Sequence, residues 1–172
     1  PTKFFPSVNF HGDKYIQIAN SGPESSTQNI LHAYFTAISS AEKRICITTP
    51  YFVPNESILM ALKTAAAGGV DVRLILPGRI DSKIVQYSSR SFILELLNAN
   101  IRVYFYEEGF IHAKVMLIDD HLSIVGSANF DYRSFYHNFE ISALIYDHEI
   151  NTKLKKQFDK DKRSSKKIKI EH

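Results

Sequence analysis

The sequence predicts an α/β fold in which a mixed β-sheet is flanked by helices on both faces, and two observations support it. Between residues 14 and 106, segments rich in β-branched residues alternate with segments that place apolar residues at helical spacing. This is the pattern of parallel strands joined by right-handed helical crossovers. Between residues 112 and 146, short apolar segments follow one another with turns between them, which indicates antiparallel strands. A chain of 172 residues, 44% of them hydrophobic, suffices for one domain with a core.

The first strand and helix follow an opening of 13 residues without periodicity, residues 1–13, which we interpret as a linker to a domain over residues 14–163. Residues 14–19 alternate between apolar and polar and predict a strand. Ser25 and Ser26 are the expected helix cap. The helix should end near residue 41 and turn an apolar stripe towards the sheet: Ile30, Leu31, Tyr34, Phe35 and Ile38.

Two further strand and helix pairs continue the pattern. Residues 44–49 predict an inner strand, followed by a helix that Asn55 caps and that Gly68 and Gly69 end, and residues 70–76 predict the next strand. The stripe of the second helix consists of Ile58, Leu59, Leu62, Ala65 and Ala66. A third helix, capped by Asp81 or Ser82 and leading to a strand at residues 101–106, should face inward with Val85, Ser89, Phe92, Ile93 and Leu96.

The last third of the chain predicts a hairpin, a further strand and a helix. Strands at residues 112–118 and 122–125 are separated by three polar residues, and a strand at residues 139–146 follows a loop at residues 127–138. The final helix carries a narrow apolar stripe on otherwise largely charged faces, made of Ile150, Leu154 and Phe158.

The net charge of +3 hides an uneven distribution, because nine basic residues and two aspartates lie between residues 153 and 169. The basic tail that we place at residues 164–172 can attract an anionic lipid surface or nucleic acid, or it can be a solvated end. The one cysteine, Cys46, lies in an apolar run, so we expect a buried thiol and no internal disulfide. No apolar run reaches the roughly 18 residues of a membrane-spanning helix, so we expect a soluble piece.

His112 and Lys114 present an imidazole and an ammonium together. On the strand predicted there, both side chains point to one face about 7 Å apart. Histidine suits proton transfer near neutral pH, and lysine supplies a point charge for phosphoryl oxygens. Ser127 and Asn129 can donate hydrogen bonds to the same oxygens if the hairpin brings Gly126 back beside the start of its partner strand. The set predicts phosphodiester chemistry without a metal.

Two carboxylates complete the candidate site. Asp119 ends the motif strand, and we assign it a structural role in which it holds a loop amide or pairs with a cation. Glu140 begins a strand between Phe139 and Ile141, apolar neighbours beside which an unpaired carboxylate would be costly. We therefore predict that Glu140 orients the His112 imidazole and stabilises its protonated form.

Four side chains outside the motif are candidates for lining a substrate pocket, although aromatic residues at strand ends and in loops often only pack. They are Tyr51, Arg133, Phe135 and Tyr136. Of these, we predict that Tyr51 binds substrate together with Ser127 and Asn129.

The motif resembles that of a known family. The run His112-x-Lys114-x₄-Asp119-x₆-Gly126-Ser127-x-Asn129 is similar to the HKD signature of the phospholipase D superfamily. The wider stretch, from residues 49–54 through 129–135 to 138–140, resembles the C-terminal half of a bacterial cardiolipin synthase. The resemblance covers nearly everything from about residue 21 to residue 150 and implies a phospholipase D-like half-domain.

The resemblance implies a two-step phosphatidyl transfer that needs no metal or organic cofactor. One HKD histidine attacks phosphorus to form a phosphohistidine, and the histidine of a second HKD, the role implied for His112, protonates the leaving alcohol. Phosphatidylglycerol or a related phospholipid would be the donor, and the hydroxyl of a second phospholipid would be the acceptor. The expected partners are therefore an anionic phospholipid and the bacterial cell membrane, at its cytoplasmic face, rather than nucleic acid.

The sequence departs from the family pattern because only His112 is followed two residues later by lysine. The second HKD then lies either in an upstream half of a longer chain or in a homodimer mate related by a twofold axis. We favour the upstream half, because the opening residues resemble an inter-domain linker. Two other functions stay open: a homodimeric, single-HKD phosphodiesterase or nuclease, and a catalytically silent module that docks on anionic membrane.

Overall fold

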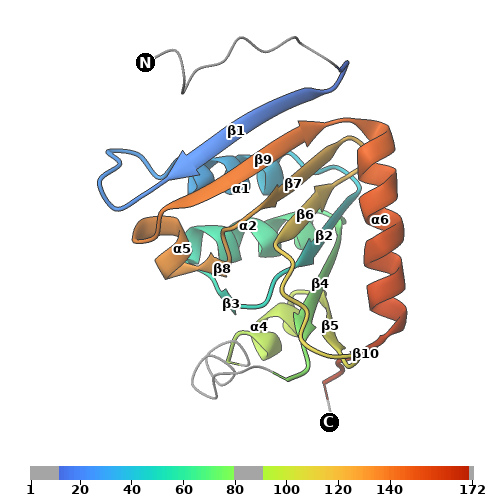
Figure 1. Cartoon of the computed structure of the whole chain (residues 1–172). Coiled ribbons are helices and arrows are strands. Elements are labelled where there is room, and N and C mark those ends of the chain that lie inside the picture. Colours follow the sequence, from blue (N-terminus) through green and yellow to red (C-terminus); the bar gives the residue numbers. More distant parts are fainter. Residues whose placement is uncertain (1–11, 80–90, 171–172) are drawn as a thin grey trace, which may run out of the picture.

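A mixed β-sheet with helices on both faces forms the body of this computed structural model, which describes residues 12–79 and 91–170 (Figure 1). Its strands are β1 (Tyr15–Ser21), β2 (Arg44–Thr48), β4 (Asp71–Pro77), β5 (Arg102–Tyr106), β6 (Val115–Ile118), β7 (Leu122–Gly126), β9 (Glu140–Tyr146) and β10 (Ser165–Lys167). The helices are α1 (Asn29–Ser39), α2 (Glu56–Ala67), α4 (Ile93–Asn98), α5 (Tyr132–Tyr136) and α6 (His148–Arg163). A small second sheet pairs β3 (Phe52–Val53) with β8 (Phe130–Asp131). The predicted fold class is confirmed.

The large sheet has a parallel block and an antiparallel block. Within the described residues its order is β1-β9-β7-β6-β2-β4-β5-β10, and β2, β4 and β5 are parallel. Antiparallel pairing relates β1, β9, β7 and β6, and β6 joins the two blocks by antiparallel pairing with β2. The prediction was incomplete for β1, which has the same direction as β2 but lies at the far edge, because three strands from the second half of the chain insert between them.

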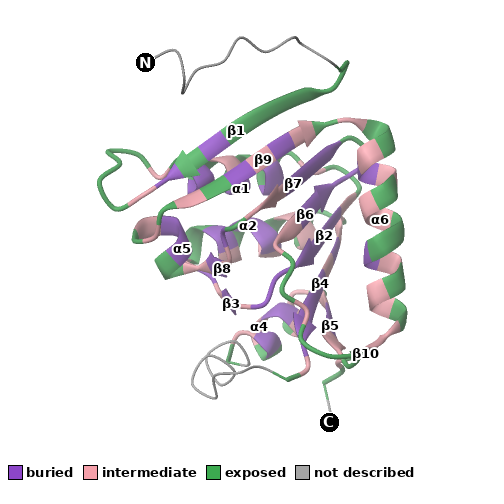
Figure 2. Cartoon of the chain, viewed as in Figure 1, coloured by how far each residue is buried: buried purple, intermediate pink, exposed green. Residues whose placement is uncertain are grey.

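The sheet buries a different set of side chains on each face. On β2, Ile45 and Ile47 point to the large core formed with α1, α2 and α4, whereas Cys46 points to a smaller core that includes Phe158 of α6. This alternation follows from the period of two along a strand. Cys46 is fully buried, as predicted, and burial raises the pKa of its thiol to about 11. The central strands are therefore buried on both faces (Figure 2).

The first helix differs from its prediction at its start and on one side. It begins at Asn29, and its cap residue Gln28 makes no side-chain capping hydrogen bond, so the predicted cap at Ser25 or Ser26 was wrong. Phe35 is exposed, whereas the other four residues of the predicted stripe are buried. Phe35 lies beside the stripe rather than within it, because α1 touches the sheet along a narrow face.

The second and third helices follow the sequence where they are described. Asn55 caps α2 as predicted, because its side chain accepts a hydrogen bond from the Ile58 amide. Only the end of the predicted third helix is described, as α4, in which Ile93 and Leu96 are buried. The predicted cap at Asp81 or Ser82, and the inward residues Val85 and Ser89, lie outside the described residues.

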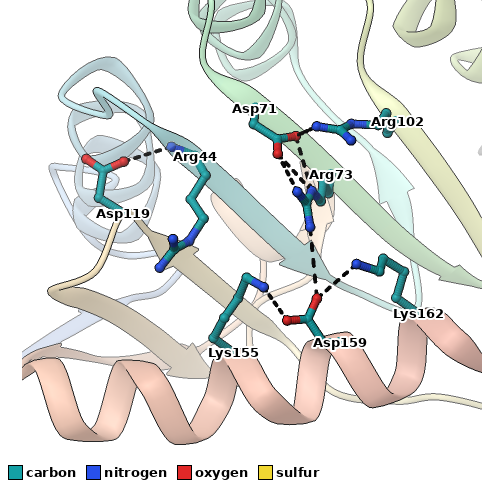
Figure 3. Close-up of polar contacts among 8 residues, drawn as sticks. All are labelled: Arg44, Asp71, Arg73, Arg102, Asp119, Lys155, Asp159 and Lys162. Atoms are coloured by element: carbon teal, nitrogen blue, oxygen red, sulfur yellow. Dashed lines mark hydrogen bonds and ion pairs between the residues drawn. The ribbon is translucent and has the colours of Figure 1, made fainter.

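Polar contacts fasten the C-terminal helix α6 to the sheet (Figure 3). Asp159 pairs with Lys155 and Lys162 on its own helix and lies 3.9 Å from Arg73 Nη1 on β4. Arg73 also donates to Asp71, which Arg102 of β5 contacts as well. Burial alone would raise the Asp71 pKa, but these two guanidinium groups lower it below its usual value. Charges thus hold α6 beside β4 and β5.

The residues after α6 return to the sheet as its edge strand. Ser165, Lys166 and Lys167 of β10 pair antiparallel with β5, and the Ile168 amide donates to the Val103 carbonyl at 3.0 Å. Three residues of the predicted basic tail are therefore part of the sheet, while the domain boundary at residue 163 stays a prediction. No helix in the described ranges is long and apolar enough to cross a bilayer.

One part of the sheet carries exposed apolar residues. Helix α6 packs on β2, β5, β6 and β7, and the same face of β1 and β9 presents Ile16 and Ile18, cross-strand partners of Ile145 and Ala143. Ile16, Ile18 and Ile141 are each at least 50% exposed, and the nearby Phe139 is 77% exposed. We call these four residues the β1–β9 apolar face.

Candidate active site

The motif residues lie together at the end of the sheet where the parallel strands β2, β4 and β5 have their C-terminal residues. Strand β7 has the same direction and ends there at Gly126, whereas β6 and β9 have the opposite direction and begin there at Val115 and Glu140. His112 and Lys114 come directly before β6. Four chain segments thus meet at one edge of the sheet, the usual place for a site in an α/β fold.

The imidazole and the ammonium of the motif are in contact. Lys114 Nζ lies 3.1 Å from His112 Nδ1 and 3.2 Å from His112 Nε2, and it donates to the His112 carbonyl at 2.9 Å. The predicted strand began too early, because β6 starts only at Val115. The Gly126 amide nevertheless donates to the Lys114 carbonyl at 3.2 Å, so the hairpin still positions the motif. His112 is exposed, and the Phe110 ring lies 5.5 Å from it.

Burial and nearby charges shift the pKa of Lys114 in opposite directions. Burial lowers the pKa of Lys114 below its usual value, and the nearby carboxylates of Glu140 and Asp131 offset part of that shift. The Lys114 side chain is half-buried, and its charge is complementary to that of a phosphoryl oxygen.

Gly126 permits the close approach of β7 to β9. A Cβ atom at this position would lie 2.4 Å from the Ile141 carbonyl oxygen and 2.7 Å from Ser142 Cα, so no other residue fits without a backbone shift. The next residue, Ser127, donates its amide to the Ile141 carbonyl at 2.9 Å. The hydrogen bond from the Gly126 amide to the Lys114 carbonyl brings the hairpin back beside the start of β6, the condition on which the prediction for Ser127 depended.

Glu140 is held by polar neighbours. Its carboxylate accepts a hydrogen bond from Ser127 Oγ and another from Asn138 Nδ2 at 3.1 Å. Its apolar neighbours Phe139 and Ile141 are exposed, so the expected apolar surroundings were wrong: alternation along β9 turns them away from it. Among the described contacts Glu140 makes no hydrogen bond to His112, and its orienting role stays a prediction.

Asp119 follows the last residue of β6, so it lies at the end of this strand that is farther from His112. Its Oδ1 accepts the amides of Lys43 and Arg44 at 2.8 Å each, and its Oδ2 accepts the amide of Glu42 at 3.0 Å (Figure 3 shows the bond to Arg44). Its backbone is in the left-handed region, with φ of 51°. Asp119 closes the hairpin turn and fixes the start of β2, far from any group that would touch a substrate.

A cavity of about 390 Å³ lies beside the motif, between the β3–β8 sheet and α5. Tyr51, Asn129 and Arg133 line it, so two of the three predicted substrate-binding residues share one cavity. The Asn129 side-chain oxygen is buried and, within the described residues, has no hydrogen-bond partner. Phe135 is in the core instead, and Tyr136 accepts a hydrogen bond from Asn55.

The middle of the predicted loop at residues 127–138 is a short strand followed by a short helix. Phe130 of β8 pairs with Phe52 of β3, and α5 follows directly. Asp131 caps α5 by accepting the Ser134 amide at 2.7 Å, and Ser134 Oγ in turn accepts the Asn129 amide at 3.1 Å. Aspartate is a preferred N-cap residue, so Asp131 was a helix-start signal available in the sequence. This small unit positions Asn129.

Comparison with known sequences identifies relatives over nearly the whole chain. The family model described as "Cardiolipin synthase, PLD-like domain" matches residues 34–162. The chain is 45% identical over 157 residues to cardiolipin synthase 2 of Bacillus cereus, and 44% identical over 164 residues to cardiolipin synthase of a Geobacillus species. These matches cover 91% and 95% of this chain but 30% and 33% of the relatives. The chain thus spans about a third of their length.

Solved structures share the fold. Nuc of Salmonella typhimurium, a phospholipase D family member, superposes with a TM-score of 0.78 at 21% identity, over 92% of this chain and 100% of that one. Phosphatidylserine synthase of Haemophilus influenzae superposes with a TM-score of 0.76 at 16% identity, over 94% of this chain and 41% of that one. With a family model that matches three quarters of its residues, the chain belongs to the family of cardiolipin synthase, phospholipase D-like domains.

Proposed function

We propose that this chain is one half of a phosphatidyltransferase that forms cardiolipin from phosphatidylglycerol or a related phospholipid. The observation that carries the proposal is the contact between His112 and Lys114. Asn129 of the same motif lines a cavity. An imidazole for proton transfer and an ammonium for phosphoryl oxygens are thus already together. The 43–45% identity to cardiolipin synthases supports a phospholipid as substrate.

The transfer proceeds in two displacements at phosphorus. In the first, one histidine nitrogen bonds to phosphorus, the bond from phosphorus to the glycerol oxygen breaks, and a second imidazole gives that oxygen a proton. In the second, a lipid hydroxyl loses its proton to the same second imidazole and bonds to phosphorus, and the phosphorus–nitrogen bond breaks. We assign the second imidazole to His112, because this half resembles the C-terminal one. Lys114 neutralises the phosphoryl oxygens in both steps.

The reaction needs another histidine, which the partner half supplies. We propose that this partner is the remaining part of a longer chain, bearing its own HKD motif, and that it covers the β1–β9 apolar face. Ile16, Ile18 and Ile141 are each at least 50% exposed there, and Phe139 still more, a patch typical of an interface. Phe139 and Ile141 flank Glu140 of the site, so a partner seated on this face reaches the edge that carries His112.

The proposal is tested in a chimaeric synthase, made by replacing the matching segment of the Bacillus cereus enzyme with this chain. In cells that lack cardiolipin synthase, the chimaera should restore cardiolipin, and His112→Ala should abolish it. His148→Ala, at an exposed histidine that begins α6, is the matched control and should leave synthesis intact. Cardiolipin formed at the normal level by the His112→Ala chimaera would refute the assignment.

A second function, a homodimeric phosphodiesterase, is favoured by one observation. The superposition covers all of the Nuc chain, so a phospholipase D family member can consist of a single half of this size. In that case two copies of this chain would pair and each would supply one His112. The purified chain would then cleave DNA in the presence of EDTA, and cleavage would disappear with His112→Ala. A monomeric chain that leaves DNA intact excludes this alternative.

A further inference from the structure

An apolar groove lies at the edge of the sheet opposite β1, between α4 and the edge strand β10. Leu94 and Leu97 of α4 form one side, Ile168 and Ile170 form the other, and Phe105 of β5 lies between them. This open groove has a volume of about 560 Å³. Leu94 is 58% exposed and Ile170 is 40% exposed. Water therefore contacts aliphatic side chains that a neighbouring apolar phase would cover favourably.

Two lysines line the same groove. Lys166 and Lys169 are exposed, and within residues 12–79 and 91–170 neither forms an ion pair. The acidic residue nearest along α4, Glu95, is bound to Lys63. The groove thus combines an aliphatic interior with free cations, which is the chemical complement of a molecule with an acyl chain and an anionic head.

Further cations lie on α6, on the other face of the sheet from α4. Lys156, Lys160 and Arg163 occupy one stripe, at spacings of four and three, on the side of the helix opposite the buried Phe158. Because Phe158 packs in the smaller core and α4 on the large one, this stripe is separate from the groove. The neighbouring Lys155 and Lys162 share the single carboxylate of Asp159.

Three acidic residues adjoin these cations. Glu107 and Glu108 follow β5 and are exposed, and the Glu107 amide donates to the Ser164 carbonyl at 3.0 Å. Asp161 of α6 accepts a hydrogen bond from Gln157. These three reduce the positive charge without reversing it, because six exposed cations without an ion pair lie between residues 156 and 169 of the described chain: Lys156, Lys160, Arg163, Lys166, Lys167 and Lys169.

We propose that the groove between α4 and β10 docks on an anionic phospholipid surface, with acyl chains against Leu94 and Ile170 and lipid phosphates on Lys166 and Lys169. The inference rests on the proposed function in one respect, since an enzyme that joins two phospholipids must meet a bilayer. A nucleic acid would use the lysines but would gain nothing from the aliphatic residues, because base stacking needs aromatic or guanidinium planes.

The groove runs away from the end of the sheet that carries the motif. Strand β10 begins at Ser165, opposite Tyr106, where β5 ends near the motif. Because β10 is antiparallel to β5, Ile168 lies beside Val103, near the start of β5. Docking through this groove therefore uses a surface separate from the motif.

The test is co-sedimentation of the purified full chain with vesicles of phosphatidylglycerol and phosphatidylcholine, compared with pure phosphatidylcholine. The double variant Lys166→Gln with Lys169→Gln should weaken binding to the anionic vesicles about 30-fold, since each lysine near such a surface contributes roughly fivefold. The charge-matched control, Lys43→Gln with Lys153→Gln, removes two exposed lysines outside the groove and should change binding by less than about threefold. An equal loss in both double variants would overturn the proposal.

The apolar half of the groove has its own control. Leu94→Ser with Ile170→Ser should weaken binding severalfold even at high salt, where charge attraction is screened. Met60→Ser, at an exposed apolar residue of α2, should not. Equal binding by these variants, equal binding to neutral vesicles, or salt-sensitive binding of the chain to DNA but not to vesicles would each overturn the proposal. Thermal unfolding verifies that every variant is folded.

Failure of docking and failure of the proposed function are separable. In the chimaeric synthase supplied with substrate in detergent micelles, the lysine variant should retain phosphatidyl transfer, because micelles need no docked bilayer. The isolated His112→Ala chain should still bind vesicles. Loss of transfer by the lysine variant in micelles would place these lysines in the reaction and overturn the docking role.

Discussion

Lys114 Nζ is almost equally distant from the two ring nitrogens of His112, at 3.1 and 3.2 Å. The two nitrogens flank Cε1, so a point that close to both and in the ring plane would collide with the Cε1–H group. The ammonium therefore lies over the face of the imidazole, where the π-electrons attract a cation. Within the described residues, no other group hydrogen-bonds to either ring nitrogen. The motif thus holds its cation and its imidazole in contact.

The first prediction concerns pH. Lys114 has a lowered pKa, so phosphate binding by its ammonium should fall at a pH below the ordinary lysine value of 10.5. Glu140→Gln removes a carboxylate that raises the Lys114 pKa, and the alkaline loss of binding should therefore move to lower pH. NMR titration of the lysine side-chain resonances in the purified chain, with inorganic phosphate as probe, measures both. Glu149→Gln, at the start of α6, is the control, and a shift to higher pH in Glu140→Gln would contradict the argument.

The second prediction concerns Gly126. Gly126→Ala places a methyl group against the Ile141 carbonyl and Ser142, forcing β7 and β9 apart, and should lower the free energy of unfolding by about 2–4 kcal/mol. Gly68→Ala is the matched control, because its Cβ would meet only carbonyl oxygens of its own helix at 3.4 Å. Urea unfolding followed by circular dichroism measures both, and equal midpoints for the two variants would be the contrary result.

The third prediction concerns Asp119. Asp119→Asn keeps the side-chain shape and tolerates the left-handed backbone, but it removes the charge to which three amides donate, so it should cost about 3 kcal/mol at neutral pH. Asp120→Asn, with a half-exposed carboxylate, should cost less than about 1 kcal/mol.

The pH dependence of the Asp119 effect has a definite sign. Burial would raise the Asp119 pKa, but the amides of Arg44, Glu42 and Lys43 lower it below the usual 3.8. The stabilisation is therefore fully present above that value and lost as pH falls through the lower folded pKa. In acid unfolding experiments, the free energy of unfolding of the wild type should fall to that of Asp119→Asn only in this acid range. If the difference in unfolding free energy between the two proteins disappeared between pH 6 and 8 instead, the Asp119 carboxylate would not be its source.

The fourth prediction concerns the cavity. Arg133 is exposed, lines the cavity with Asn129, and forms no ion pair in the described part of the chain. A guanidinium there can bind a lipid phosphate through two hydrogen bonds. Arg133→Gln in the chimaeric synthase should raise KM roughly tenfold with little change in unfolding free energy, while Arg163→Gln on α6 should leave KM in detergent micelles unchanged. An unaltered KM for Arg133→Gln would remove Arg133 from the substrate site.

The fifth prediction concerns Cys46. Its thiol is fully buried and its pKa is raised to about 11, so at pH 8 it carries almost no thiolate. Alkylation by iodoacetamide should be at least a hundredfold slower than in urea, as mass spectrometry would show. Rapid alkylation of the folded chain would mean that the small core beneath α6 opens readily.

The sequence predicts the fold well where neighbouring residues decide it. Apolar spacing places α2, and Asn55 marks its start because its cap is a local contact. The position of β1 depends on β9, more than a hundred residues later, and no local pattern contains that pairing. Phe35 is misassigned for a similar reason, since the width of the buried stripe depends on what packs on the helix.

The candidate site shows the same division. Spacing in the sequence identifies His112 and Lys114, because both lie in one short segment whose side chains meet. The cavity could not be foreseen, since it forms only when the β3–β8 pair brings Tyr51 beside Asn129. The hydrogen-bond partners of Glu140 could not be predicted from the sequence either, because Ser127 and Asn138 belong to two different loops.

Strand β6 is the one strand through which the antiparallel block of the described sheet is joined to the parallel block. Its pairing with β2, from Ile45 opposite Ile118 to Thr48 opposite Val115, is the only ladder that joins them. Separating the blocks would break that ladder, so amides on these strands should be among the last to exchange with deuterated solvent. The motif directly precedes this strand. An exposed histidine is thus anchored to the part of the molecule that opens least often, which keeps its position constant while surface segments fluctuate.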